Sequence, residues 1–194
     1  MEFIIIAIIA VILSVILGIL FGYNLKKVKV EENSDNEASL YIAVTNKILI
    51  ANISNTYTRI QTIAHECLHS VQNRKILMFN FIFSNIYILY YITICVLAIF
   101  KILPNKLVFL SIYLLLSLVY YMVRIYLEND AMINAKYLAK EYMEEIKISS
   151  KEEINKIVKE FGKINDIGIR CVNYKFFLNI IVKLLIFLGI CIVR

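Results

Sequence analysis

The stretch IFSNIYILYYITICVLAIFKILPNKLVFLSIYLLLSLVYYMV, from Ile82 to Val123, decides the fold. It holds two apolar runs, Ile82 to Phe100 and Leu107 to Val123, separated by a short segment around Pro104. Each run approaches the roughly 20 residues that a helix needs to cross about 30 Å of hydrocarbon. The stretch therefore predicts a hairpin of two membrane-spanning helices.

Two further apolar runs flank this hairpin, Phe3 to Tyr23 and Phe176 to Val193. The whole chain is 60% hydrophobic, which is well above the share in globular proteins. The first run has no Lys or Arg before it and no small-residue cleavage site, so we expect it to stay as an anchor and not to be removed as a signal peptide. The sequence predicts four transmembrane helices in all.

The 21 Lys and Arg residues give a net charge of +6, and their placement decides what this charge means. Seven lie between the first and second runs and ten between the third and fourth, whereas the Pro104 segment holds only Lys101 and Lys106. Because basic loops stay in the cytoplasm, we expect a multi-pass protein of the cell membrane with both large polar segments inside the cell. The charge sets the topology and predicts no nucleic-acid partner.

The segment between the first two runs is expected to begin as a linker and then to fold. Glu31 to Glu37 is polar and acidic, as linkers are. Leu40 to Val44 and Lys47 to Ala51 are rich in β-branched residues and predict a small hairpin or pair of strands. The second of these strands could align an extended substrate by edge pairing. From Thr56 to Asn73 apolar residues recur every three or four positions, which predicts an amphipathic helix.

The segment after the third run is expected to be helical as well. Tyr126 to Ile146 contains no Gly or Pro and can continue directly from the membrane span. A second helix should begin at Ser150, which has capping-box spacing to Glu153. We expect that helix to end near Gly162.

The amphipathic helix carries the sequence His65-Glu66-Cys67-Leu68-His69, which is an HExxH motif. Two histidines one helical turn apart point the same way and can bind one Zn²⁺, and the glutamate can act as general base toward a zinc-bound water. These are the only histidines of the chain, so the spacing would rarely arise by chance. The motif predicts a zinc-dependent peptidase with one Zn²⁺ per chain. Cys67 could be read as a nucleophile, although a buried apolar cysteine is the commoner case.

A catalytic zinc ion normally has three protein ligands and one open position. Glu128 is the best candidate for the third ligand, because the predicted hairpin brings the segments after His69 and Val123 to one side of the membrane. Asp130 is the competitor. It points to a different helix face, so we assign it a supporting role, in which it accepts the free ring N–H of a zinc-bound histidine.

The chain resembles the bacterial neutral zinc metallopeptidases called YugP-like, through Ala64-His65-Glu66-x-x-His69-x-x-Gln72 and, after paired spans, Glu128-x-Asp130-Ala131. The resemblance covers most of the chain. It implies a multi-pass membrane zinc peptidase with His65, His69 and Glu128 as ligands. Leu68 stands where the family usually has Gly, and Cys67 replaces a small or acidic residue.

Two rival interpretations remain. An HtpX-like or prenyl-protease-like membrane peptidase also combines HExxH with a later glutamate, but it usually has an acidic residue four positions after that glutamate, where this chain has Met132. A catalytically inactive membrane scaffold of the same fold is the rival from another class, and zinc content would separate it from a peptidase.

The sequence thus predicts a mainly α, integral membrane protein with four transmembrane helices and a small cytoplasmic zincin-like unit of helices with short strands. Its partners would be the lipid bilayer and a peptide or protein substrate, with the active site on the cytoplasmic side. The expected segments are an anchor at 1–24, a cytoplasmic segment at 25–78, the transmembrane hairpin at 79–124, a second cytoplasmic segment at 125–175 and a closing transmembrane helix at 176–194.

Overall fold

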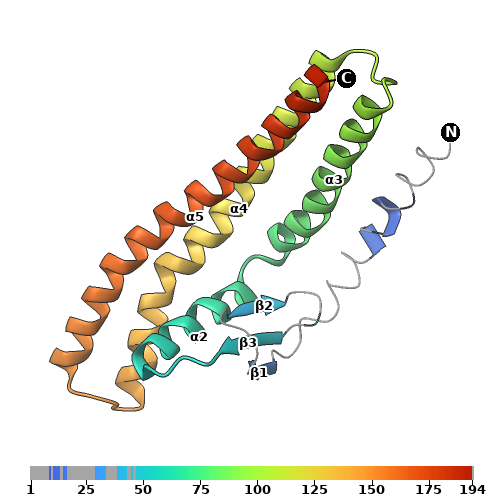
Figure 1. Cartoon of the computed structure of the whole chain (residues 1–194). Coiled ribbons are helices and arrows are strands. Elements are labelled where there is room, and N and C mark those ends of the chain that lie inside the picture. The colour runs from blue at the N-terminus through green and yellow to red at the C-terminus, as the bar shows by residue number, and fades with distance from the viewer. Residues whose placement is uncertain are drawn as a thin grey trace. The chain divides into compact units, whose positions relative to one another are not determined.

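The computed structural model of the chain describes residues 9, 11–13, 15–16, 29–33, 39–42, 45 and 47–193. It is mainly helical with one small sheet (Figure 1). The elements are β1 (Lys29–Asn33), β2 (Leu40–Ile42), β3 (Lys47–Ala51), α2 (Thr56–Val71), α3 (Arg74–Ile99), α4 (Lys106–Glu145) and α5 (Lys151–Val193). Two compact units are formed, one from residues 1–20, 75–125 and 173–194, the other from residues 21–74 and 126–172.

Three helices, α3, α4 and α5, are long and apolar enough to cross a membrane. They contain the second, third and fourth apolar runs of the sequence. The expected first span, Phe3 to Tyr23, falls mostly outside the described residues, of which 9, 11–13, 15 and 16 are helical.

The first unit is held together by a core of aromatic and aliphatic side chains from α3, α4 and α5. Tyr87, Tyr113 and Phe187 are almost completely buried in it. The hydroxyl groups of Tyr87 and Tyr113 are hydrogen-bonded at 2.9 Å, and the Ser117 hydroxyl donates to the Tyr113 backbone carbonyl at 2.7 Å. Pairing these polar groups with one another makes them compatible with an apolar surrounding.

The second unit contains a three-stranded sheet in the order β1-β3-β2. β2 and β3 pair antiparallel, with Tyr41 opposite Ile48, which confirms the expected pairing for the described residues. β1 pairs parallel to β3 and covers Glu31 to Asn33, so the expectation of a linker from Glu31 to Glu37 is wrong at its start. Although β1 is polar, it is held in the sheet by backbone pairing with β3 and by an ion pair of 2.8 Å between Lys47 Nζ and the Glu31 carboxylate.

The central position of β3 overturns the expectation that Lys47 to Ala51 aligns a substrate by edge pairing. β3 is hydrogen-bonded to β1 on one side and to β2 on the other, so neither of its edges can accept another strand. β1 and β2 are the edge strands of the sheet, and β2 is the one that packs against α2.

The second unit is completed by α2 packed on α4. α2 begins at the N-cap Asn55, whose side-chain oxygen accepts from the Thr58 backbone N–H at 3.0 Å. Its apolar face buries Ile60 and Ala64 in one cluster with α4. On α4 the buried positions Ala131, Ala135 and Ala139 follow one another at intervals of four residues. Side chains this small let the two helix backbones approach closely.

α5 runs without interruption from Lys151 to Val193, so the expectation that a helix ends near Gly162 is wrong. The predicted start is confirmed, because the Ser150 hydroxyl accepts from the Glu153 backbone N–H at 3.3 Å. Glycine lowers helix propensity by about 1 kcal/mol but does not stop a helix whose neighbours are good formers. At Gly168 a Cβ atom would lie 2.6 Å from Met132 Cε, so this glycine marks a close approach to α4.

Candidate metal centre

His65 and His69 lie one turn apart on α2, and their rings converge. The ring centroids are 4.7 Å apart and the ring planes are nearly perpendicular. The two Nε2 atoms lie 3.2 Å from each other. Both side chains are largely buried, with exposed fractions of 23% for His65 and 13% for His69. The spacing of the motif thus places two imidazole nitrogens at one point.

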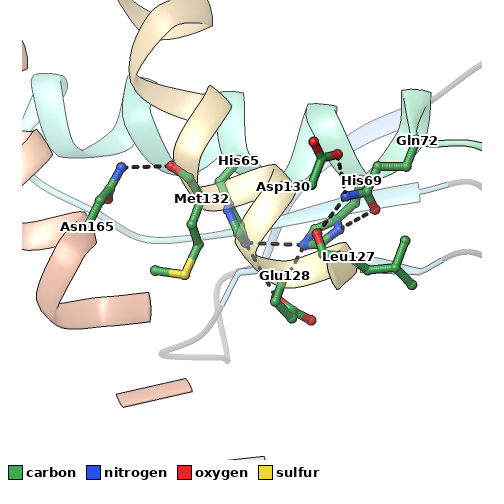
Figure 2. Close-up of polar contacts among 8 residues, drawn as sticks. All are labelled: His65, His69, Gln72, Leu127, Glu128, Asp130, Met132 and Asn165. Atoms are coloured by element: carbon green, nitrogen blue, oxygen red, sulfur yellow. Dashed lines mark hydrogen bonds and ion pairs between the residues drawn. The ribbon is translucent and has the colours of Figure 1, made fainter. Parts of the chain in front are cut away.

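Glu128 reaches the same point from α4 (Figure 2). Its Oε2 atom is 3.5 Å from His69 Nε2 and 4.0 Å from His65 Nε2. Bonds of about 2.0–2.2 Å in a tetrahedral zinc site place neighbouring ligand atoms about 3.3 Å apart. The separations of 3.2 and 3.5 Å are close to this value, and the third, between His65 Nε2 and Glu128 Oε2, is longer at 4.0 Å. These residues therefore fit a metal ion bound by two imidazoles and one carboxylate.

The two histidines differ in how strongly they hold a proton. Burial, together with the neighbouring His69, lowers the pKa of His65 to about 4, so this ring is neutral at pH 7. Burial also lowers the pKa of His69, but the hydrogen bond and charge of Glu128, with help from Gln72 and Glu66, outweigh it and leave that pKa raised. The negative charge that attracts a proton to His69 would equally attract a metal cation.

Glu66, the expected general base, is buried on α2, with an exposed fraction of 6%. Burial raises the pKa of its carboxyl group, whereas His69 and a hydrogen bond from the Tyr41 backbone lower it. Tyr41 belongs to β2, so this strand helps to orient the carboxylate. Sequence reasoning missed the contribution of Tyr41, because nothing in its side chain identifies a backbone contact.

Asp130 does not join the ligand cluster but lies beside it (Figure 2). Its carboxylate accepts from Gln72 Nε2 at 3.1 Å and from Asn134 Nδ2 at 3.0 Å. The expected acceptor role toward a histidine N–H falls to Gln72, whose Oε1 is 3.0 Å from His69 Nδ1. Asp130 is linked to His69 through Gln72. The sequence feature that could have pointed to Gln72 is its position three residues after His69, about one helical turn further along the motif.

Cys67 and Met132 are directed away from the ligand cluster. Cys67 lines an apolar cavity of about 520 Å³ together with Ile60, Ile63 and other residues of α2 and α4. Burial and the charge of Glu66 raise the pKa of the Cys67 thiol, which disfavours the nucleophilic thiolate. Met132 accepts from Asn165 Nδ2 through its backbone carbonyl at 2.9 Å, so this position serves the packing of α5 (Figure 2).

No protein-family model matches the chain, and neither the curated proteins nor the solved structures include a significant match.

Proposed function

We propose that the chain is a membrane-embedded, zinc-dependent peptidase in which His65, His69 and Glu128 hold one Zn²⁺. The observation that carries the proposal is the convergence of the two Nε2 atoms and one carboxylate oxygen, which lie 3.2, 3.5 and 4.0 Å from one another. Two imidazoles and one carboxylate form the ligand set of many zinc peptidases, with a fourth position left for water. The metal would supply Lewis acidity and lower the pKa of a bound water to about 7.

Glu66 is the proposed general base. It follows His65 directly on α2, and its carboxyl group is oriented by the Tyr41 backbone and by nearby charges. In its ionised form it can accept a proton from water at the site and pass it to the leaving amine of a cleaved peptide bond. Burial limits the access of bulk water to this carboxylate and strengthens its interactions.

The proposed setting is a four-span protein of the cell membrane with the site on the cytoplasmic side. It is supported by the three apolar helices, by the apolar run Phe3 to Tyr23 and by the distribution of Lys and Arg. The proposed substrate is a peptide or protein. The YugP-like resemblance of the motifs agrees with this proposal.

Zinc content of the purified protein tests the metal site. Wild type and Glu128→Gln would be purified in detergent, dialysed against a weak chelator and analysed for zinc per chain. Glu141→Gln makes the same substitution at an exposed position of α4 and serves as the matched control. We expect about one zinc per chain in wild type and control, following the one triad found among the described residues, and a clear loss in Glu128→Gln.

Other outcomes would change the assignment. A wild type that holds no zinc after mild supplementation would contradict the peptidase and favour a membrane scaffold. Full zinc retention in Glu128→Gln would exclude Glu128 as the third ligand, and Asp130→Asn would then be the next variant to measure.

A further inference from the structure

Gln72 connects the metal-site helix to α4 through both ends of its side-chain amide (Figure 2). α2 ends at Val71, and Gln72 leaves the helical conformation with a ψ of 159°. From there Nε2 donates to the Leu127 carbonyl at 2.6 Å and to Asp130 Oδ2 at 3.1 Å. Oε1 lies 3.0 Å from His69 Nδ1.

These partners determine which way the amide faces. The Leu127 carbonyl and the Asp130 carboxylate are both acceptors, so the end of the Gln72 amide that faces them must be the NH₂ group. A flipped amide would place its oxygen against two other oxygens. The carbonyl end therefore faces His69, and because it can only accept, His69 Nδ1 must carry a proton.

We propose that Gln72 is a positioning residue that holds His69 in its metal-binding tautomer; this inference rests on the proposed zinc site. A neutral imidazole protonated at Nδ1 has its lone pair on Nε2, the atom that faces His65 and Glu128. The ring of His65 is oriented differently, by a hydrogen bond with the Ala131 backbone. Of the two histidines, His69 is thus the one whose tautomer depends on a side chain.

A positioning role of Gln72 predicts an effect on zinc affinity that a role in packing alone would not. Partners that hold a ligand histidine fix its tautomer and ring orientation, and their loss typically weakens metal binding by about 10–100-fold. Gln72→Leu keeps the approximate size of the side chain but removes the acceptor. Gln61→Leu is the matched control, because Gln61 is a buried glutamine of α2 whose amide atoms have no hydrogen-bond partner.

The test measures zinc affinity of the full-length protein in detergent by competition with a chelating dye. We expect Gln72→Leu to bind zinc about 10–100-fold more weakly than wild type and Gln61→Leu to stay within about threefold. Equal zinc affinities of wild type and Gln72→Leu would overturn the inference while leaving the proposed function intact. A wild type without zinc affinity would instead overturn the proposed function.

A second measurement does not depend on any Gln72 variant folding. The chain has two histidines, so ¹⁵N-histidine labelling gives ring signals from only two side chains, and His65→Asn assigns them. In zinc-loaded wild type, the ¹⁵N shifts of His69 should show the metal on Nε2 and the proton on Nδ1. A proton on Nε2 would overturn the inference.

Discussion

At the scale of single residues, some groups of the site can be identified from the sequence, and others can be identified only from the structure. The spacing of His65, Glu66 and His69 was sufficient to predict that two imidazoles face one point. Glu128 could be proposed only by elimination, because its contact depends on how α4 packs on α2. The position of Gln72 in the motif is visible in the sequence, but its contact with α4 is not, since it depends on the Leu127 carbonyl, a backbone atom far away in the sequence.

Replacing the proposed base separates metal binding from catalysis. Glu66→Gln removes the proton acceptor but keeps the shape of the side chain, and Glu66 is not among the residues that form the triad. We expect zinc content to be unchanged and peptide cleavage to fall by about 10²–10⁴-fold. The measurement is cleavage of a fluorogenic peptide library by zinc-loaded protein, with Glu141→Gln as control. Cleavage that survives in Glu66→Gln would contradict the assigned role.

The lowered pKa of His65 predicts a pH dependence of stability in chelator-treated protein. Its pKa is 6.5 in the unfolded chain and about 4 in the folded one, so between these values the unfolded chain binds more protons. The free energy of unfolding should therefore fall as the pH is lowered from 6.5 to about 4, by on the order of 2–3 kcal/mol from this group, and then level off. Denaturant titrations in detergent check this. A His65→Asn variant with the same pH slope would argue against it.

At the scale of the elements, local sequence patterns predicted the features that depend on neighbouring residues. They missed the features that depend on contacts with residues far away in the chain. The start of α2 and the continuation of α4 follow from caps and from the absence of helix breakers. β1 was missed because its acidic residues pair with residues of β3 that lie 18 positions further along the chain. The end of a helix at Gly162 was predicted wrongly because the continuing α5 packs on α4, and that contact was invisible in the sequence.

Gly162→Ala tests the uninterrupted α5. The nearest atom to a Cβ at this position is Lys136 Nζ at 3.9 Å, which is an ordinary contact distance. Alanine in place of glycine inside a helix should raise the free energy of unfolding by about 0.5–1 kcal/mol. Thermal unfolding of both proteins in the same detergent measures the change. Destabilisation would indicate that residue 162 is not inside a helix.

Ala135→Leu tests the close approach of α2 and α4. Ala135 is 1% exposed and belongs to the same core cluster as Ile60 and Ala64. A larger side chain there should destabilise the chain by about 1–3 kcal/mol and, by displacing Glu128 from the histidines, weaken zinc binding. Ile133→Leu, at an exposed position of α4, should change neither quantity. Zinc affinity equal to wild type in Ala135→Leu would show that the triad does not depend on this packing.

At the scale of the whole molecule, the apolar runs and the charges predict a membrane topology that labelling can test. Cys171 is an exposed native thiol in the basic segment, and Ile102→Cys places a thiol in the exposed Pro104 segment. In variants that keep one thiol each, a membrane-impermeant maleimide should label Ile102→Cys in intact cells and Cys171 only after permeabilisation. Labelling of Cys171 in intact cells would contradict the predicted topology and indicate the opposite orientation.

The regular spacing of the alanines on α4 bears on the register in which α2 packs along α4. Ala131, Ala135 and Ala139 repeat every four residues, so sliding α2 along α4 by about 6 Å would put one alanine where the next had been. The alanine repeat by itself therefore does not distinguish between neighbouring registers. The Gln72 bond to the Leu127 carbonyl and the triad form in one register only, so removing the metal should narrow the energy gap between registers. In this way a bound ion would set the alignment of two helices as well as take part in chemistry.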